Sequence, residues 1–188
     1  MKRELWYSVV VRDRHGKVIS REHRKSKSFL KAWNQLVYVQ MKSEVTGESI
    51  VDTDGVSQSI TAHTYNFAMN AAAGTITYGI RVGTGNTPVA IDDYALDAPI
   101  AEGTGVDEMN HLVCTVATSV VAAPSCSFLV SRAITNNSGS EITVREAGIH
   151  AIMKVGVVGL ITRDVFVTPQ AVPNGGTITI DWTLQVTV

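Results

Sequence analysis

The sequence has little of what marks a disulfide-bonded, secreted or membrane-spanning protein. Its two cysteines, Cys114 and Cys126, are too few for a disulfide framework, and no second pair suggests zinc. No apolar run approaches the roughly 18–20 residues of a membrane span. The first residues are charged from Lys2 onward, which does not fit a signal peptide. We expect a soluble chain with no membrane partner, whose cysteines are either bridged across neighbouring strands or buried as free thiols.

Charged residues are also few. They make up 18% of the chain, while 45% of residues are hydrophobic, a balance that argues against disorder. A length of 188 residues suits one domain with a substantial core, or one domain plus an arm. Threonine and valine are abundant and lysine is sparse, which favours strands and turns.

Motifs for catalysis and cofactor binding are missing. The stretch "GIRVGTGNTP", residues 79–88, lacks the third glycine of a dinucleotide motif, and no helix pattern follows it. Adjacent carboxylates occur only in expected loops, no nucleophile elbow is found, and the histidines show no metal-ligand spacing: His15, His23, His63, His111 and His150. We therefore expect no enzyme activity, no cofactor and no metal.

The basic residues are unevenly distributed. Residues 1–31 hold ten of the sixteen basic residues and three acidic ones, a net charge of +7, which leaves −8 for the rest of a chain whose total is −1. Such a split indicates either a nucleic-acid contact or docking on an acidic neighbour, including another copy of the chain. Few aromatic residues in this segment, chiefly Trp6 and Tyr7, could stack on bases, so nucleic acid is not the expected partner.

The N-terminal part predicts a hairpin followed by a helix. In "LWYSVVVRDRHGKVIS", residues 5–20, an apolar run, a turn ending in Gly16 and a second short run are typical of a hairpin. Ser26 or Ser28 could then cap a helix, whose apolar residues recur at helical spacing: Phe29, Trp33, Leu36, Val37 and Met41.

Residues 43–58 are polar and rich in turn formers, which predicts a linker. We expect a basic docking arm over residues 1–44, made of the hairpin and the helix, and a main domain over residues 45–188. Asp52 and Asp54 before Gly55 resemble part of a calcium loop, but the remaining ligands are missing. A turn is the better interpretation.

From residue 59 onward the chain predicts successive strands, separated by the turns "NNSGS" (136–140) and "PNGG" (173–176). Alternation is clearest at the end, where one face holds Ile178, Ile180, Trp182, Leu184, Val186 and Val188. We predict a mainly β protein, an antiparallel β-sandwich, jelly-roll-like or immunoglobulin-like, with an N-terminal hairpin and one α-helix. Trp6, Trp33 and Trp182 all fall in patterns that face the core.

One strand breaks its own alternation. In "EITVREAGIHAI", residues 141–152, Gly148 predicts a bulge or a close backbone approach that re-aims Arg145 and Glu146. Arg145 would pair with an acidic residue of its own chain such as Asp164, fixing the strand register, or would reach a neighbouring subunit.

Three stretches together resemble a known class of proteins. "YGIRVGTGNTPVAIDDYALDAPI" (78–100) is similar to a pattern in tailed-bacteriophage structural proteins, carried here by Gly83, Gly85, Thr87, Pro88, Asp93 and Leu96. "SRAITNNSGSEITVREAGIHA" (131–151) resembles the Arg-Glu-x-Gly strand of phage tail-collar fibre and virion attachment domains. "LITRDVFVTPQAVPNGGTITIDWTLQV" (160–186) is similar to their closing hairpin. The resemblance covers residues 76–188 and leaves out the basic arm.

This resemblance implies a non-enzymatic structural component of a virion, assembled in the host cytoplasm. It would form homo-oligomers and dock on other virion structural proteins at the tail, collar or fibre attachment point. The alternatives are a capsid decoration or vertex protein and, from another class, a host-glycan-binding module. The candidate assembly residues are Arg12, Arg14, Arg21, Arg24, Lys25, Arg145 and Glu146.

Overall fold

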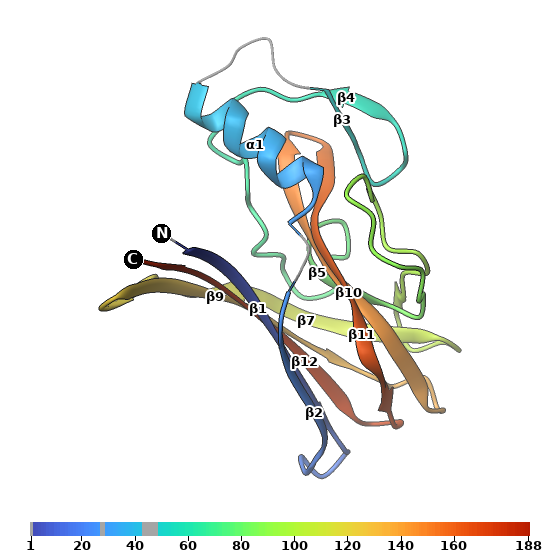
Figure 1. Cartoon of the computed structure of the whole chain (residues 1–188). Helices are drawn as coiled ribbons and strands as arrows, with labels where there is room; N and C mark the ends of the chain where they lie inside the picture. Colours follow the sequence, from blue (N-terminus) through green and yellow to red (C-terminus); the bar gives the residue numbers. More distant parts are fainter. Residues whose placement is uncertain (1, 27–28, 43–48) are drawn as a thin grey trace.

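The computed structural model describes residues 2–26, 29–42 and 49–188 and has a β-sandwich-like fold of two largely antiparallel sheets (Figure 1). The larger sheet has seven strands in the order β2-β1-β12-β9-β7-β6, with β8 paired to β9 beside this path. Its strands are β1 (Lys2–Arg12), β2 (Val18–Lys25), β6 (Ala101–Glu102), β7 (Glu108–Val116), β8 (Val120–Ala122), β9 (Ser125–Thr135) and β12 (Thr177–Thr187).

The smaller sheet has the order β11-β10-β5. Its strands are β5 (Gly79–Gly83), β10 (Ile142–Lys154) and β11 (Val157–Val172). A separate hairpin is formed by β3 (Ser49–Val51) and β4 (Ser57–Ser59). One continuous apolar core lies between the two sheets, and it includes Ile80, Val130, Ile149 and Ile180. The predicted mainly β sandwich with one helix is confirmed.

The N-terminal hairpin belongs to the larger sheet. β1 pairs with β12 along its whole length, from Lys2 opposite Thr187 to Arg12 opposite Thr177, and its inner residues Val9 and Val11 are fully buried. The hairpin is therefore part of the sandwich and not an appended arm. The predicted boundary between residues 44 and 45 lies outside the described residues.

Helix α1 (Lys31–Lys42) packs on β11 and β3 through its apolar face. Leu36 and Val39 are buried, but Met41 is exposed, so the predicted apolar face ends one turn early. Ser26 donates a hydrogen bond to Asp164 (Oγ–Oδ2, 2.6 Å) and does not cap the helix, while Ser28 lies outside the described residues. No helix in the described part of the chain is long and apolar enough to span a membrane.

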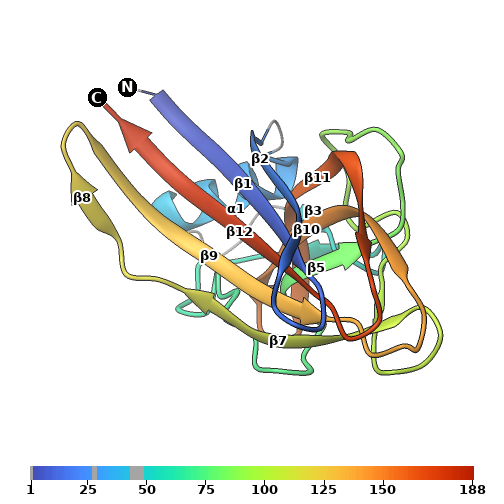
Figure 2. The same ribbon diagram turned by 90° about the horizontal axis from the view of Figure 1, so that it is seen from below.

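The alternation predicted for β12 is present, but its apolar face is not buried along the whole strand. Trp182 is 0% exposed, whereas Val186 is 39% exposed and Val188 is 92% exposed, although these side chains alternate in phase with Trp182. Figure 2 shows the reason: the smaller sheet lies over one half of the larger sheet, and the end with the two termini and the β8–β9 hairpin extends beyond it.

One further expectation was wrong. Trp6 lies on the outer face of β1, because its neighbours Leu5 and Tyr7 are the buried residues; its ring stacks on His23 with centroids 5.4 Å apart. Of the two alternatives for the cysteines, the structure has the free thiols, with Cys114 buried and Cys126 partly buried. The turn predicted at Asp52 is confirmed, since its side chain accepts hydrogen bonds from the amides of Asp54 and Val56.

Candidate functional site

A buried ion pair connects two of the stretches that stood out in the sequence. Glu146 on β10 and Arg163 on β11 are both almost fully buried, and Arg163 Nε donates to Glu146 Oε2 at 2.7 Å. Arg163 Nη1 also contacts Asp93 (Oδ2, 2.8 Å), and Nη2 donates to the main-chain and side-chain oxygens of Thr87. Arg163 thereby joins the smaller sheet to the loop over residues 84–100.

Glu146 holds the same loop from the other side. Its Oε1 accepts a hydrogen bond from the amide of Ala98 at 2.9 Å, and its Oε2 accepts one from Asp97 at 3.2 Å. Gly83 and Gly85 leave room for this carboxylate, since a Cβ on either would come within 2.6 Å of Glu146 Oε1. We name the group of Thr87, Asp93, Glu146 and Arg163 the loop clamp.

Strand geometry explains how Glu146 reaches the loop. Val144 pairs with Gln170 but Glu146 pairs with Val165, so the ladder is irregular at Arg145, three residues before Gly148, where the bulge was predicted. Gly148 itself is regularly paired and instead permits a close approach, because a Cβ there would lie 2.7 Å from Leu160 Cδ1. The ion pair of this region is formed by Glu146 and Arg163. No ion pair joins Arg145 to Asp164 among the described residues, so that expected pairing was wrong.

The electrostatics of the loop clamp favour a structural role. Burial alone would lower the pKa of Arg163, but hydrogen bonds to Glu146 and Asp93 outweigh it and raise that pKa. The guanidinium therefore stays charged and fully engaged. A shallow hollow of about 370 Å³ beside it is lined mainly by residues of the loop, among them Asp92 and Tyr94.

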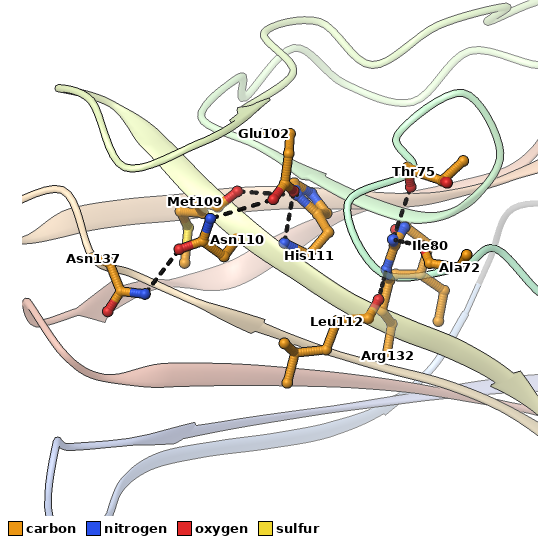
Figure 3. Close-up of polar contacts among 10 residues, drawn as sticks. All are labelled: Ala72, Thr75, Ile80, Glu102, Met109, Asn110, His111, Leu112, Arg132 and Asn137. Carbon is orange, nitrogen blue, oxygen red and sulfur yellow. Dashed lines mark hydrogen bonds and ion pairs between the residues drawn. The ribbon is translucent and has the colours of Figure 1, made fainter.

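A second buried arginine, Arg132 on β9, is bound in a different way (Figure 3). Its Nε donates to the carbonyl of Leu112 at 2.7 Å, and its Nη1 donates to that of Ile80 at 2.9 Å. Its Nη2 donates to the carbonyls of Ala72 and Thr75, at 3.2 and 2.7 Å. These bonds connect β9 to β7, to β5 and to the loop before β5, and burial lowers the pKa of Arg132.

His111 and Glu102 lie beside Arg132 in Figure 3. His111 Nδ1 is 2.9 Å from Glu102 Oε2 and 3.2 Å from the carbonyl of Met109. Both partners accept, so Nδ1 carries the proton. Burial, together with the charge of Arg132, lowers the pKa of His111 to about 4. At neutral pH a neutral imidazole therefore faces a carboxylate.

This histidine–carboxylate pair does not form a catalytic arrangement with its described neighbours. His111 Nε2 is buried and has no hydrogen-bond partner among the described residues, so no hydroxyl or thiol is placed for activation. The described residues also contain no group of three or more side chains suited to hold a metal ion. The arrangement orders the start of β7 against β6.

The five basic residues predicted for assembly all lie on the β1–β2 hairpin. Arg12, Arg14 and Arg21 are exposed on the β1–β2 hairpin and have no carboxylate partner among the described residues. Arg24 pairs with Glu22 at 3.1 Å and Lys25 with Glu4 at 3.0 Å. These five basic residues can meet a neighbour.

The two candidates on β10 differ. Arg145 is half-buried, whereas Glu146 is fully buried inside its own subunit. A role of Glu146 at a subunit surface is therefore ruled out, because its carboxylate already serves the loop clamp.

Sequence patterns did not identify Arg163, Arg132 and the pair of Glu102 and His111 as parts of the site. For Arg163 a signal existed, since a charged residue lies two positions after the apolar run Leu160-Ile161 inside a strand. Arg132 gives the same signal in "FLVSRAI". Charged residues inside apolar strands are retained when they are paired or hydrogen-bonded.

Comparisons with known proteins add no assignment. No family model, no curated protein and no solved structure matches the chain.

Proposed function

We propose that the chain is a non-enzymatic structural component of a bacteriophage virion, which oligomerises and docks on neighbouring virion proteins. The main support is that the motif residues of two resembling stretches, Gly83 to Leu96 and Glu146 to Gly148, are parts of one connected structure. The glycines, Thr87 and Asp93 surround the Glu146–Arg163 pair, and Leu96 packs with Leu30 and Leu160. The order of motifs thus has a physical reason, which isolated matches would lack.

The docking surface we propose is the exposed end of the β1–β2 hairpin. Arg12, Arg14 and Arg21 lie there without a carboxylate partner in the described part of the chain, and the sequence outside residues 1–31 is net acidic. An acidic surface on a neighbouring virion protein would complement them. Exposed charges of this kind guide association and weaken with salt.

The test replaces all three arginines and keeps the strands, because deleting residues 1–24 would remove β1 and nearly all of β2 from one edge of the larger sheet. With Arg12→Glu, Arg14→Glu and Arg21→Glu combined, we expect incorporation into particles to fall by about tenfold or more. The matched control substitutes lysine at the same positions and should be incorporated normally, since it keeps the charge. Normal incorporation of the glutamate variant would contradict the docking role, and tight DNA binding by the intact protein would favour a nucleic-acid contact.

One observation favours glycan binding as a second candidate. Trp6 is only half-buried and forms a stacked pair with His23 on the outer face of the larger sheet, which gives this face the aromatic surface that the sequence had not predicted. Glycan binding by the purified protein that Trp6→Ala abolishes would support this candidate.

A further inference from the structure

The inner face of the larger sheet remains apolar beyond the half that the smaller sheet covers. Residues directly opposite each other on paired strands share a face, and Trp182 is opposite Val130, both in the core. The same face continues outward along β12, β9, β8 and the end of β7. We call its outer part the overhang, made of Val116, Val121, Cys126, Phe128, Leu184 and Val186.

Exposure increases along the overhang. Leu184 and Phe128 still pack partly on the core, but Val121 is 79% exposed. A groove of about 500 Å³ opens where Val116 and Phe128 face Trp33 and Phe67. A contiguous exposed apolar surface of this kind marks an interaction site.

The overhang also lacks charge. Residues 112–130, "LVCTVATSVVAAPSCSFLV", contain no Asp, Glu, Lys, Arg or His. The two overhang residues outside this range, Leu184 and Val186, are also uncharged. β8 is an edge strand, and exposed edges are normally protected by charged residues. Within these six residues a charged partner would find no counter-charge, whereas a second copy meets no like charge. The flanking position opposite Val186 on β1 is Arg3.

We propose that the overhang is a self-association surface, on which the overhang of a second copy packs face to face. Two sheets pack in this way about 10 Å apart with their strands roughly aligned. Each copy would then supply the missing second layer over the uncovered half of the other, in a two-fold arrangement that uses the same patch twice. The inference rests on the oligomerisation included in the proposed function.

The test measures the mass of the purified protein by sedimentation or light scattering, without particles, so either proposal can fail independently. We expect the wild type to form dimers. Val121→Glu places a charge in the apolar interface and should weaken association by about 100-fold or more. The matched control is Val106→Glu, because Val106 is equally exposed at 79% but precedes β7 at its other end. It should associate like the wild type, and both variants should give unchanged circular dichroism.

Two outcomes would overturn the proposal. A wild-type chain that is monomeric at about 100 μM would leave the overhang to a different protein. A Val121→Glu chain that still dimerises would show that the copies associate through another surface.

Discussion

Arg163 and Arg132 are both buried, and each connects a loop to a sheet, but their charges are compensated differently. Arg163 is paired with the carboxylates of Glu146 and Asp93, which raises its pKa. Arg132 donates four hydrogen bonds to main-chain carbonyls, and burial lowers its pKa. The loop over residues 84–100 is thus held by charge pairing, and the loop over residues 72–75 by backbone dipoles. The two regions should respond to different perturbations.

The largest effect is expected from Glu146→Ala. Among the described residues, this change leaves the buried Arg163 with Asp93 as its carboxylate partner, and it removes the acceptor for the amides of Asp97 and Ala98. Breaking one side of a buried ion pair costs about 3–5 kcal/mol. We expect the free energy of unfolding, measured by urea titration, to fall by that amount.

The control for this prediction removes both charges. The double variant Glu146→Leu with Arg163→Met should recover part of the lost stability, since the unpaired guanidinium is removed and the carboxylate of Asp93, whose side chain is 21% exposed, can be hydrated. A single Glu146→Ala variant as stable as the wild type would show that the loop clamp does not stabilise the fold.

The contrast between the arginines also shows what local sequence patterns can predict. Alternation and turn composition predicted the strands, because both depend on neighbouring residues. The bulge predicted at Gly148 instead lies at Arg145. The partner of Glu146 could not be predicted, since Arg163 and Asp93 come from a different strand and a distant loop, separated from each other by 70 residues. The order of strands in the sheets likewise depends on long-range pairing.

The incomplete cover of the larger sheet by the smaller one could not be predicted for the same reason, since it depends on long-range packing. The alternation in β12 correctly placed Trp182 in the core, but Val186 continues that pattern and is 39% exposed. The pattern identifies the face of a strand and carries no information about where the opposing sheet ends.

The next largest effect is a loss of stability at low pH, which should arise from buried histidines in the region around Arg132. The pKa values of His111 and His150 are lowered from 6.5 to about 4 and about 3, chiefly by burial and further by Arg132 and Arg81 respectively. Both histidines are therefore neutral in the fold but protonate near pH 6.5 when unfolded. Their contribution to stability is complete above pH 6.5 and is lost as the pH falls. For His111 the loss between pH 7 and pH 4 should be about 3 kcal/mol.

A variant separates this effect from the titration of carboxylates. His111→Asn keeps a donor for Glu102 but cannot protonate, so its free energy of unfolding should fall less steeply than that of the wild type between pH 7 and pH 4. Equal slopes in the two proteins would mean that His111 titrates alike in the folded and unfolded chains.

The smallest effect on the free energy of unfolding is expected from Arg145→Ala, although its neighbour Glu146 is the site of the largest expected effect. Arg145 is half-buried at the irregular point of β10, and the described residues provide it with no carboxylate partner, whereas the adjacent Glu146 is buried and fully bonded. Substitutions outside such networks usually change stability by no more than about 0.5 kcal/mol. We expect that limit for Arg145→Ala in the same urea titration, and additivity to within about 0.5 kcal/mol when it is combined with Glu146→Ala. A loss above 1 kcal/mol, or a clear departure from additivity, would show that Arg145 helps to fix the register of β10 after all.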